Sequence, residues 1–218
     1  NPQNLSWADW QRRQITEMLK KIYRRVTGPS GIKPNLKITA SVFGRPSVGY
    51  SSYYQDSKEW LKQGIMDASC PMIYWPIDHN LEWSFDYMLN DFAQATYNRH
   101  LYPIVGRSQE ANFILTNIFN EINYARSVPT TQGYCIFTYT FLKNNNYWAN
   151  FQTAPNQTPA KPPAMPWKSI IPSYIIVTAT PTILPADGNS QATVRAEIKD
   201  IAGYTVTSAS LPVTFSLS

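Results

Sequence analysis

Hydrophobic and polar positions follow two different rhythms along this chain of 218 residues. In the longer first part, apolar side chains at helical spacing alternate with short apolar runs that are typical of buried strands. The spacing predicts helices over residues 7–26, 52–63, 81–97 and 111–126, and strands over residues 36–43, 67–75, 101–105 and 133–141. Such alternation is typical of right-handed βαβ units that build a parallel sheet.

Four strands and four helices amount to half of an eightfold α/β barrel, which needs roughly 250 residues when complete. The pattern therefore predicts an α/β fold of the half-barrel type. A doubly wound open sheet is the alternative. Because no glycine-rich phosphate loop follows any predicted strand, a nucleotide-binding version of that sheet has little support.

A proline-rich stretch separates the two rhythms. Residues 153–172 hold six prolines and no glycine, which is typical of a semi-rigid extended linker. Beyond it, apolar and polar residues alternate with a period of two, and turn-forming residues such as Pro185-Ala-Asp-Gly-Asn join the runs. This pattern predicts the start of a β-sandwich, because residues 173–218 are too few for a complete one. Residues 1–152 then form the α/β domain.

Composition narrows the classes of function. Aromatic residues make up 14% of the chain and charged residues 15%, which excludes a disordered chain. The Tyr and Trp rings either pack in the core or line a carbohydrate cleft, since sugars present apolar faces that stack on rings. The net charge is +5, but the basic residues form no stripe with interleaved aromatics, so nucleic-acid binding is not predicted.

The cysteines and histidines predict neither a metal site nor another cofactor. Cys70 and Cys135 lie inside apolar runs and are expected to be buried free thiols. His79 and His100 have no acidic or thiol partner at ligand spacing. The sequence contains no apolar stretch long enough to cross a membrane and no signal-peptide pattern. A targeting segment upstream of Asn1 is compatible with this sequence.

Several short stretches, taken in order, resemble a known family. They are Trp7-Ala-Asp-Trp-Gln-Arg-Arg, Ser41-Val-Phe-Gly, Tyr54-Gln-Asp-Ser-Lys-Glu-Trp-Leu-Lys-Gln-Gly and Met66-Asp-Ala-Ser-Cys-Pro-Met-Ile-Tyr-Trp. Their order, spacing and placement resemble the glycosyl hydrolase-like 10 family of bacterial envelope proteins. The resemblance covers roughly residues 5–142. It implies a (β/α)8 TIM-type barrel that acts on glycans such as peptidoglycan strands.

The resemblance also implies which part of the barrel is present. The four predicted strands correspond to barrel strands five to eight, so the chain is the C-terminal half of the barrel. The family's strand-four segment, which supplies a catalytic carboxylate, is absent and is expected upstream of Asn1. The implied function is that of a glycoside hydrolase fragment acting on bacterial cell-wall or other polysaccharide. The chain alone is expected to be inactive.

The sequence beyond the linker carries a second resemblance. Val177-Thr-Ala-Thr-Pro, Leu184-Pro-Ala-Asp-Gly-Asn-Ser-Gln-Ala-Thr and Val213-Thr-Phe resemble the invasin-type bacterial Ig-like repeat, a spacer on secreted or surface proteins. This implies that residues 173–218 are the N-terminal part of an Ig-like domain. It also implies a protein that is secreted, periplasmic or displayed on the cell surface.

Glycoside hydrolysis needs two carboxyl groups that flank the scissile bond, and in a barrel they lie at the carboxyl ends of strands. Asp78 is the best-placed candidate, with Glu82 next, and the resemblance adds Asp56 as a second catalytic candidate. Each has a structural alternative, Asp78 in a loop or helix cap and Asp56 at the start of a helix. Asp67 is expected to be structural, and Glu121 to be solvated in mid-helix.

Five residues are predicted to bind substrate at the same rim. Tyr74 and Trp75 end a predicted strand, where a ring can stack on a pyranose. Arg45 and Arg107 follow two other strands and can hold a carboxylate or acetamido group. Tyr139 ends the last predicted strand and can donate a hydrogen bond.

Two alternatives to hydrolysis remain open. One is a non-catalytic glycan-binding or surface-adhesion module with the Ig-like repeat as its spacer. The other is a structural piece whose partner half comes from another chain. An open half barrel exposes strand edges and apolar surface. We therefore expect completion by upstream sequence, by another chain or by a second copy in a homo-oligomer.

Overall fold

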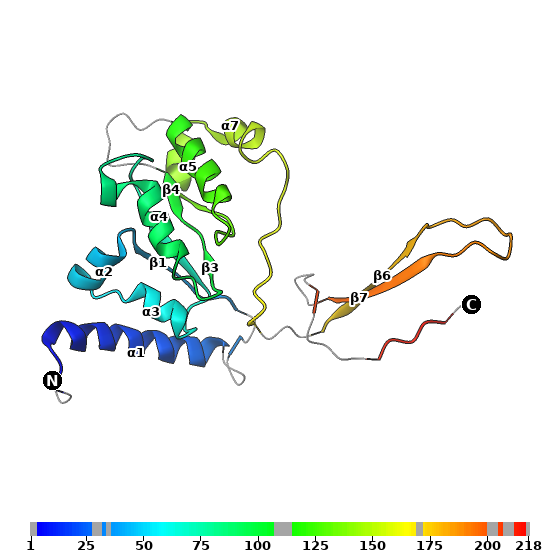
Figure 1. Ribbon diagram of the computed structural model, residues 1–218, viewed down its shortest axis with the longest axis horizontal. Coiled ribbons are helices and arrows are strands. Elements are labelled where there is room, and N and C mark those ends of the chain that lie inside the picture. Colours follow the sequence, from blue (N-terminus) through cyan, green and yellow to red (C-terminus); the bar gives the residue numbers. More distant parts are fainter. Residues whose placement is uncertain are drawn as a thin grey trace. The chain divides into compact units, whose positions relative to one another are not determined.

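The computed structural model describes residues 4–27, 32–33, 36–106, 115–168, 172–199, 205–206 and 212–216. The chain divides into two compact units, Asn1–Met165 and Pro166–Ser218. We call them the α/β unit and the hairpin unit, and describe each by itself (Figure 1). Within the described ranges, no helix is both long and apolar enough to span a bilayer.

The α/β unit alternates helices and strands, as the sequence pattern predicts. Its elements are α1 (Trp7–Thr27), β1 (Thr39–Phe43), α2 (Pro46–Ser52), α3 (Ser57–Lys62), β2 (Ala68–Met72), the 3-10 turn η1 (Leu81–Trp83), α4 (Phe85–Ala93), β3 (His100–Leu101), β4 (Ile104–Gly106), α5 (Leu115–Ser127), β5 (Cys135–Phe137), α6 (Tyr139–Asn144) and α7 (Trp148–Thr153). The strands pair in parallel in the order β1-β2-β4-β5, with β3 beside β2. This mixed α/β arrangement with a parallel sheet fits part of a TIM-type barrel.

The strand register assigns the side chains to two faces of the sheet. Phe43 lies opposite Met72, Met72 opposite Ile104, and Ile104 opposite Cys135. Because side chains alternate along a strand, this row shares one face, and Val105 lies on the other. Val105 is fully buried among the side chains of the helices. The row therefore lies on the face of the sheet that is turned away from the helical core.

Two helices cover the other face through apolar stripes. In α4, Phe85, Met88, Leu89 and Phe92 repeat at intervals of three and four residues, and all are fully buried. Such spacing places side chains on one side of a helix. The residues of α5 that are buried in the same way include Ile118 and Ile122, so both helices fasten to one side of the sheet.

Three predicted elements end elsewhere than the sequence pattern suggests. The strand predicted over 101–105 is broken between β3 and β4, where Pro103 has no N–H to donate to a ladder. The strand predicted over 67–75 ends at Met72, so Trp75 lies in the loop beyond it. The last predicted strand ends at Phe137, because Thr138 caps a helix by accepting the N–H of Phe141 at 3.1 Å.

A set of polar contacts around Asp67 joins α1 to the amino end of the sheet. The carboxylate of Asp67, fully buried just before β2, accepts from the hydroxyl of Tyr23 at 2.6 Å and from the N–H of Ile38 at 2.7 Å. The guanidinium of Arg99 lies 3.9 Å away. Burial, followed by the bond to Asp67, raises the pKa of Tyr23 to about 12. Asp67 thus has the structural place expected for it.

The hairpin unit contains β6 (Tyr174–Thr180) and β7 (Thr193–Lys199), which pair antiparallel along their whole length. In the loop between them, the carboxylate of Asp187 accepts from the hydroxyl and N–H of Ser190 and from the N–H of Asn189. These bonds lower the pKa of Asp187 to about 2. The described residues give a two-stranded sheet, so the Ig-like sandwich stays a prediction.

The polar contacts around Asp67 predict that a substitution of this residue by its amide lowers stability strongly. Asp67→Asn replaces one buried acceptor by an N–H₂ group facing existing donors, and should lower the free energy of unfolding by about 1–3 kcal/mol. Asp78→Asn, at an exposed loop position, is the matched control and should change it by less than about 0.5 kcal/mol. Urea unfolding of both variants measures the difference. Equal midpoints for the two variants would refute the structural role of Asp67.

Candidate functional site

A cluster of aromatic and charged side chains lies at the carboxyl edge of the sheet. It comprises Phe43 from the end of β1, Arg45 just beyond it, Trp75 after β2, and Glu82 and Trp83 from η1. The ring centroid of Trp83 lies 4.9 Å from that of Trp75 and 6.5 Å from that of Phe43. The guanidinium of Arg45 pairs with Glu82 and lies 5.2 Å from the centroid of Trp83. We call these five residues the rim cluster.

The local backbone explains why the rim cluster forms. A Cβ on Gly44 would collide with the carbonyl oxygen of Met72, so a glycine lets β1 and β2 approach closely where both strands end. The side-chain oxygen of Gln55 accepts the N–H of Phe43 at 2.8 Å. This bond folds the segment between α2 and α3 back onto the end of β1. Phe43 and Arg45 are thereby held beside the loop that carries Trp75 and Trp83.

The Arg45–Glu82 pair orients the cluster more than it stabilises the fold. The side chain of Arg45 is 22% exposed and that of Glu82 51%, and exposed pairs contribute roughly 0–1 kcal/mol. Arg45 is planar, stays charged and stacks on rings. Its guanidinium lies over the Trp83 ring, and the ion pair with Glu82 engages only part of its five N–H groups. Such a group can donate to a carboxylate or carbonyl oxygen.

Asp78 lies on the same loop as the rim cluster, between β2 and η1. It is exposed, with a positive φ of 58°, and its own N–H donates to a carboxylate oxygen of Asp86 at 3.3 Å. That bond fixes the backbone while leaving the carboxylate of Asp78 on the surface. Its catalytic role stays a prediction.

Asp56 lies at the beginning of α3 but makes no side-chain cap bond. It lines a cleft of about 270 Å³ with Tyr50 and Asp91 on the helical layer, and a second cleft with Arg12. Burial raises the pKa of Asp56. The residues that share clefts with Asp56 do not include the rim cluster, so the structure gives the two candidate carboxylates different surroundings.

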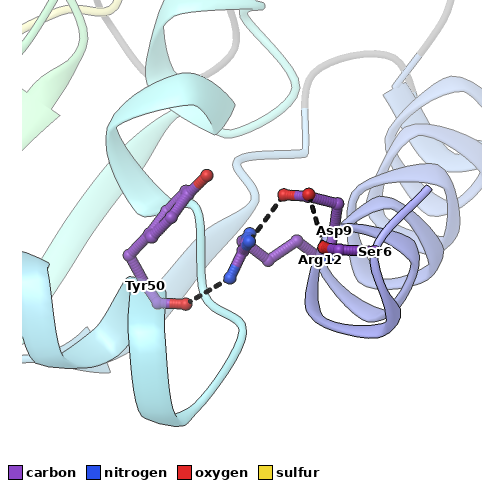
Figure 2. A network of polar contacts seen from close by, with 4 residues as sticks. All are labelled: Ser6, Asp9, Arg12 and Tyr50. Atoms are coloured by element: carbon purple, nitrogen blue, oxygen red, sulfur yellow. Dashed lines mark hydrogen bonds and ion pairs between the residues drawn. The ribbon is translucent and has the colours of Figure 1, made fainter.

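The neighbourhood of Asp56 is held by a polar network between α1 and α2 (Figure 2). Arg12 donates to the carbonyl oxygen of Tyr50 at 3.0 Å and to Asp9 at 2.6 Å, with its guanidinium 3.9 Å from the Tyr50 ring centroid. Ser6 accepts the N–H of Asp9 at 3.1 Å, so it caps the start of α1. These contacts join α1 to the layer around Asp56.

The remaining predicted binding residues fall into two further aromatic pairs. The ring centroid of Tyr74 lies 5.6 Å from that of Phe137, and burial raises the pKa of Tyr74. Tyr139 opens α6 instead of ending a strand, and its ring, 67% exposed, lies 5.5 Å from that of Trp148. Arg107 lies outside the described residues.

Sequence reasoning missed Trp83, at the centre of the rim cluster. The helical pattern over 81–97 absorbed it, whereas the structure begins α4 only at Phe85 and leaves Trp83 in η1. The signal that could have found it is Ser84, a good N-cap residue, which accepts the N–H of Tyr87. A helix that starts after Ser84 leaves Trp83 in the loop at the strand ends.

The expectation that Glu121 is solvated is wrong. Glu121 is 1% exposed, and neither of its carboxylate oxygens has a hydrogen-bond partner among the described residues. Its place in α5, three residues after Ile118 and one before Ile122, puts it on the stripe that faces the core. Burial raises the pKa of Glu121 to about 9, so the carboxyl group is protonated near neutral pH.

The two cysteines face each other across the inner side of the sheet. Cys70 is buried and Cys135 half-buried, and both are free. A hydrogen bond between their thiols raises the pKa of Cys70 and lowers that of Cys135 to about 7. Among the described residues, no three His, Cys, Asp or Glu side chains gather closely enough to hold a metal ion.

The fold and the rim together define part of a parallel α/β barrel with aromatic rings at the carboxyl ends of its strands. Residues 1–100 match the family described as Glycosyl hydrolase-like 10. The matched segment contains the whole rim cluster and both Asp56 and Asp78.

Two relatives extend this similarity. The chain is 24% identical to the glycosyl hydrolase YngK of Bacillus subtilis (strain 168) over 187 residues, which cover 73% of this chain and 35% of that protein. It is 27% identical to the glycosyl hydrolase DigH of Escherichia coli (strain K12) over 89 residues, or 34% of this chain and 20% of that protein. The chain thus spans about a third of the first relative and a fifth of the second.

The buried carboxyl of Glu121 predicts how stability changes with pH. Because its folded pKa of about 9 exceeds the ordinary value of 4.5, the folded chain keeps a proton that the unfolded chain releases between these two pH values. The contribution of the protonated Glu121 carboxyl to the free energy of unfolding is complete below about pH 4.5 and falls as the pH rises toward 9. Relative to Glu121→Gln, the natural chain should lose up to about 4 kcal/mol between pH 5 and pH 8.

Urea unfolding at the two pH values tests this expectation. Glu82→Gln, which changes an exposed carboxylate, serves as the control and should follow the natural chain. If Glu121→Gln showed the same pH dependence as the natural chain, the buried protonated state of Glu121 would be disproved.

Proposed function

We propose that this chain is the substrate-facing part of a glycoside hydrolase that acts on bacterial cell-wall or other polysaccharide. The observation that carries the proposal is the rim cluster, in which Trp83, Trp75 and Phe43 gather beside Arg45 at the strand ends. Similarity to two proteins named glycosyl hydrolases supports a role related to glycoside hydrolysis. Because the identity is low and the coverage partial, we infer the substrate from the chemistry of the rim cluster and not from the relatives.

The chemistry of the rim cluster suits a sugar ring. The apolar C–H face of a pyranose stacks on an indole, while the polar edge of the ring needs hydrogen-bond donors and acceptors beside it. Arg45, paired with Glu82, offers N–H donors for a carboxylate or acetamido oxygen. Tyr74, half-buried beside Phe137, adds a hydroxyl at the same edge of the sheet.

Hydrolysis requires a proton donor and a second carboxylate on opposite sides of the bond. In the proposal, Asp78 supplies one of them, because its carboxylate lies exposed on the rim loop. Glu82 is the alternative, although it is paired with Arg45. The second carboxylate comes from a part of the protein upstream of Asn1. Asp56 can act only on a glycan that reaches the cleft beside α3.

The open face of the sheet supports completion by more protein. Thr39 and Ser41 on β1 are exposed, as is Phe137 on β5, although all three lie on the side that is interior in a barrel. In α1, Trp7 and Met18 are also exposed. Parallel sheets are covered on both faces in soluble proteins. We infer that the upstream half of the barrel, or a second chain in its place, covers these side chains.

A glycan-binding surface module is the second candidate. It is favoured by the ion pair between Arg45 and Glu82. Because Arg45 engages Glu82, the described rim offers more binding groups than unpaired acids. In this version the hairpin unit belongs to an Ig-like spacer. For either candidate, the resemblance of residues 173–218 to Ig-like repeats supports a protein that is secreted, periplasmic or on the cell surface.

The rim cluster predicts where binding is lost. Trp83→Ala should weaken binding to purified peptidoglycan glycan strands by roughly tenfold, because it removes a stacking surface. Tyr97→Ala, which removes an exposed ring after α4, is the control and should bind like the natural chain. Sedimentation with the insoluble glycan measures both. Unchanged binding by Trp83→Ala would exclude the rim cluster as the binding site.

A substitution of Asp78 distinguishes the hydrolase from the adhesion module. In the longer protein that includes the upstream region, Asp78→Asn should reduce release of soluble sugars by about 10²–10⁴-fold with little change in binding. Chromatography of the products measures the release. Full activity of Asp78→Asn would reject the assignment, and no sugar release by the natural longer protein would favour the adhesion module.

A further inference from the structure

A further cavity lies in the α/β unit, at the end of the sheet opposite the rim cluster. It is a cavity of about 690 Å³, within the usual size range of ligand sites. Its walls come from the segment between β3 and β4, the end of α5, the loop before β5 and the chain after α7. Its lining includes Tyr102, Arg126, Gln132, Tyr134, Asn156 and Lys161. We call it the amino-end cavity.

The walls of the amino-end cavity are fixed by their own hydrogen bonds. Arg126 donates to the carbonyl oxygen of Pro155 at 2.8 Å and to the side-chain oxygen of Asn156 at 3.0 Å. The hydroxyl of Tyr134 donates to the same Asn156 oxygen at 2.8 Å. These bonds join the end of α5 to the chain that follows α7. The cavity is therefore largely formed before a ligand arrives.

A glycine shapes the floor of this cavity. Gly133 has a φ of +148°, and a Cβ there would lie 3.3 Å from the ring of Tyr102. A Cβ at this distance would be a tight contact, so the missing side chain eases the approach of the ring to the backbone. On the next residue, the half-buried ring of Tyr134 lies 5.9 Å from the guanidinium of Arg126. Two tyrosine rings thus line the cavity together with a cation.

The charge of the cavity has one sign. Arg126 and Lys161 line it, and none of the described lining residues is acidic. A guanidinium has five N–H groups, and two of those on Arg126 are engaged by Pro155 and Asn156. The other N–H groups of Arg126 can donate hydrogen bonds to an anion. Gln132 and Asn156 add amide groups, which suit the hydroxyl and acetamido groups of a sugar.

We propose that the amino-end cavity binds an acidic sugar unit of a glycan, separately from the rim cluster. The two tyrosine rings take the apolar face of the sugar, while Arg126 and Lys161 take its carboxylate. This inference rests on the proposed action on glycans, because that is what makes a sugar the anion at hand. It adds a second contact with the polymer at the end of the sheet away from the rim.

The test compares two disaccharides that differ in one carboxylate. N-acetylglucosaminyl-N-acetylmuramic acid carries a lactyl carboxylate, and chitobiose lacks it. Titration calorimetry with the 218-residue chain should show binding of the acidic disaccharide, at least about tenfold tighter than that of chitobiose. Raising the salt concentration should weaken the binding of the acidic disaccharide, because the cations are exposed.

Variants locate the binding. Lys161→Gln should weaken binding of the acidic disaccharide by roughly three- to tenfold, while Lys143→Gln, a control on α6 outside the cavity, should leave it unchanged. Added to Trp83→Ala, which removes stacking at the rim, Lys161→Gln should still lower the affinity for the acidic disaccharide, which separates this inference from the rim. Equal affinity for the two disaccharides, no binding at all, or loss with Trp83→Ala but not Lys161→Gln would each overturn the inference. None of these outcomes depends on whether the longer protein hydrolyses glycans.

Discussion

Burial of a parallel sheet on both faces is the constraint on which this structure depends. Helices α4 and α5 cover one face, where Val105 and its neighbours pack into the apolar core. The other face carries the row from Phe43 to Cys135, and its edges expose Thr39 and Phe137. A surface of this kind is stable in water only when something covers it. The proposed completion of the barrel rests on this open face.

The same parallel pairing produces the two candidate sites. All strands run in one direction, so the loops after β1 and β2 meet at one edge and bring Arg45 to Trp83. The loops before β4 and β5 meet at the opposite edge, around Tyr102 and Tyr134. The rim cluster carries two indole rings and the Arg45–Glu82 ion pair, whereas the described charged residues of the amino-end cavity are cationic. One polymer with both neutral and acidic units could use both ends.

The sequence pattern predicted the order of the elements and the apolar stripes, because periodicity reports which side of a helix is buried. It could not predict events decided by one residue, such as the break at Pro103 or the helix that Thr138 caps where a strand was expected. It also misjudged Glu121, since a charged residue on an apolar stripe is normally solvated. Among site residues, strand-end logic found Arg45 and Trp75, whereas Trp83 required knowing where α4 starts.

The central claim is that the open face of the sheet is the interior of a larger barrel. Hydrogen–deuterium exchange of residues 39–43 and 135–137 tests this claim most directly, with the 218-residue chain and the longer protein compared side by side. Edge strands exchange quickly when unpaired and slowly when a neighbouring strand accepts their N–H groups. We expect strong additional protection of both segments in the longer protein, with residues 68–72 of β2 little changed. Equal exchange of the edge segments in the two proteins would contradict it.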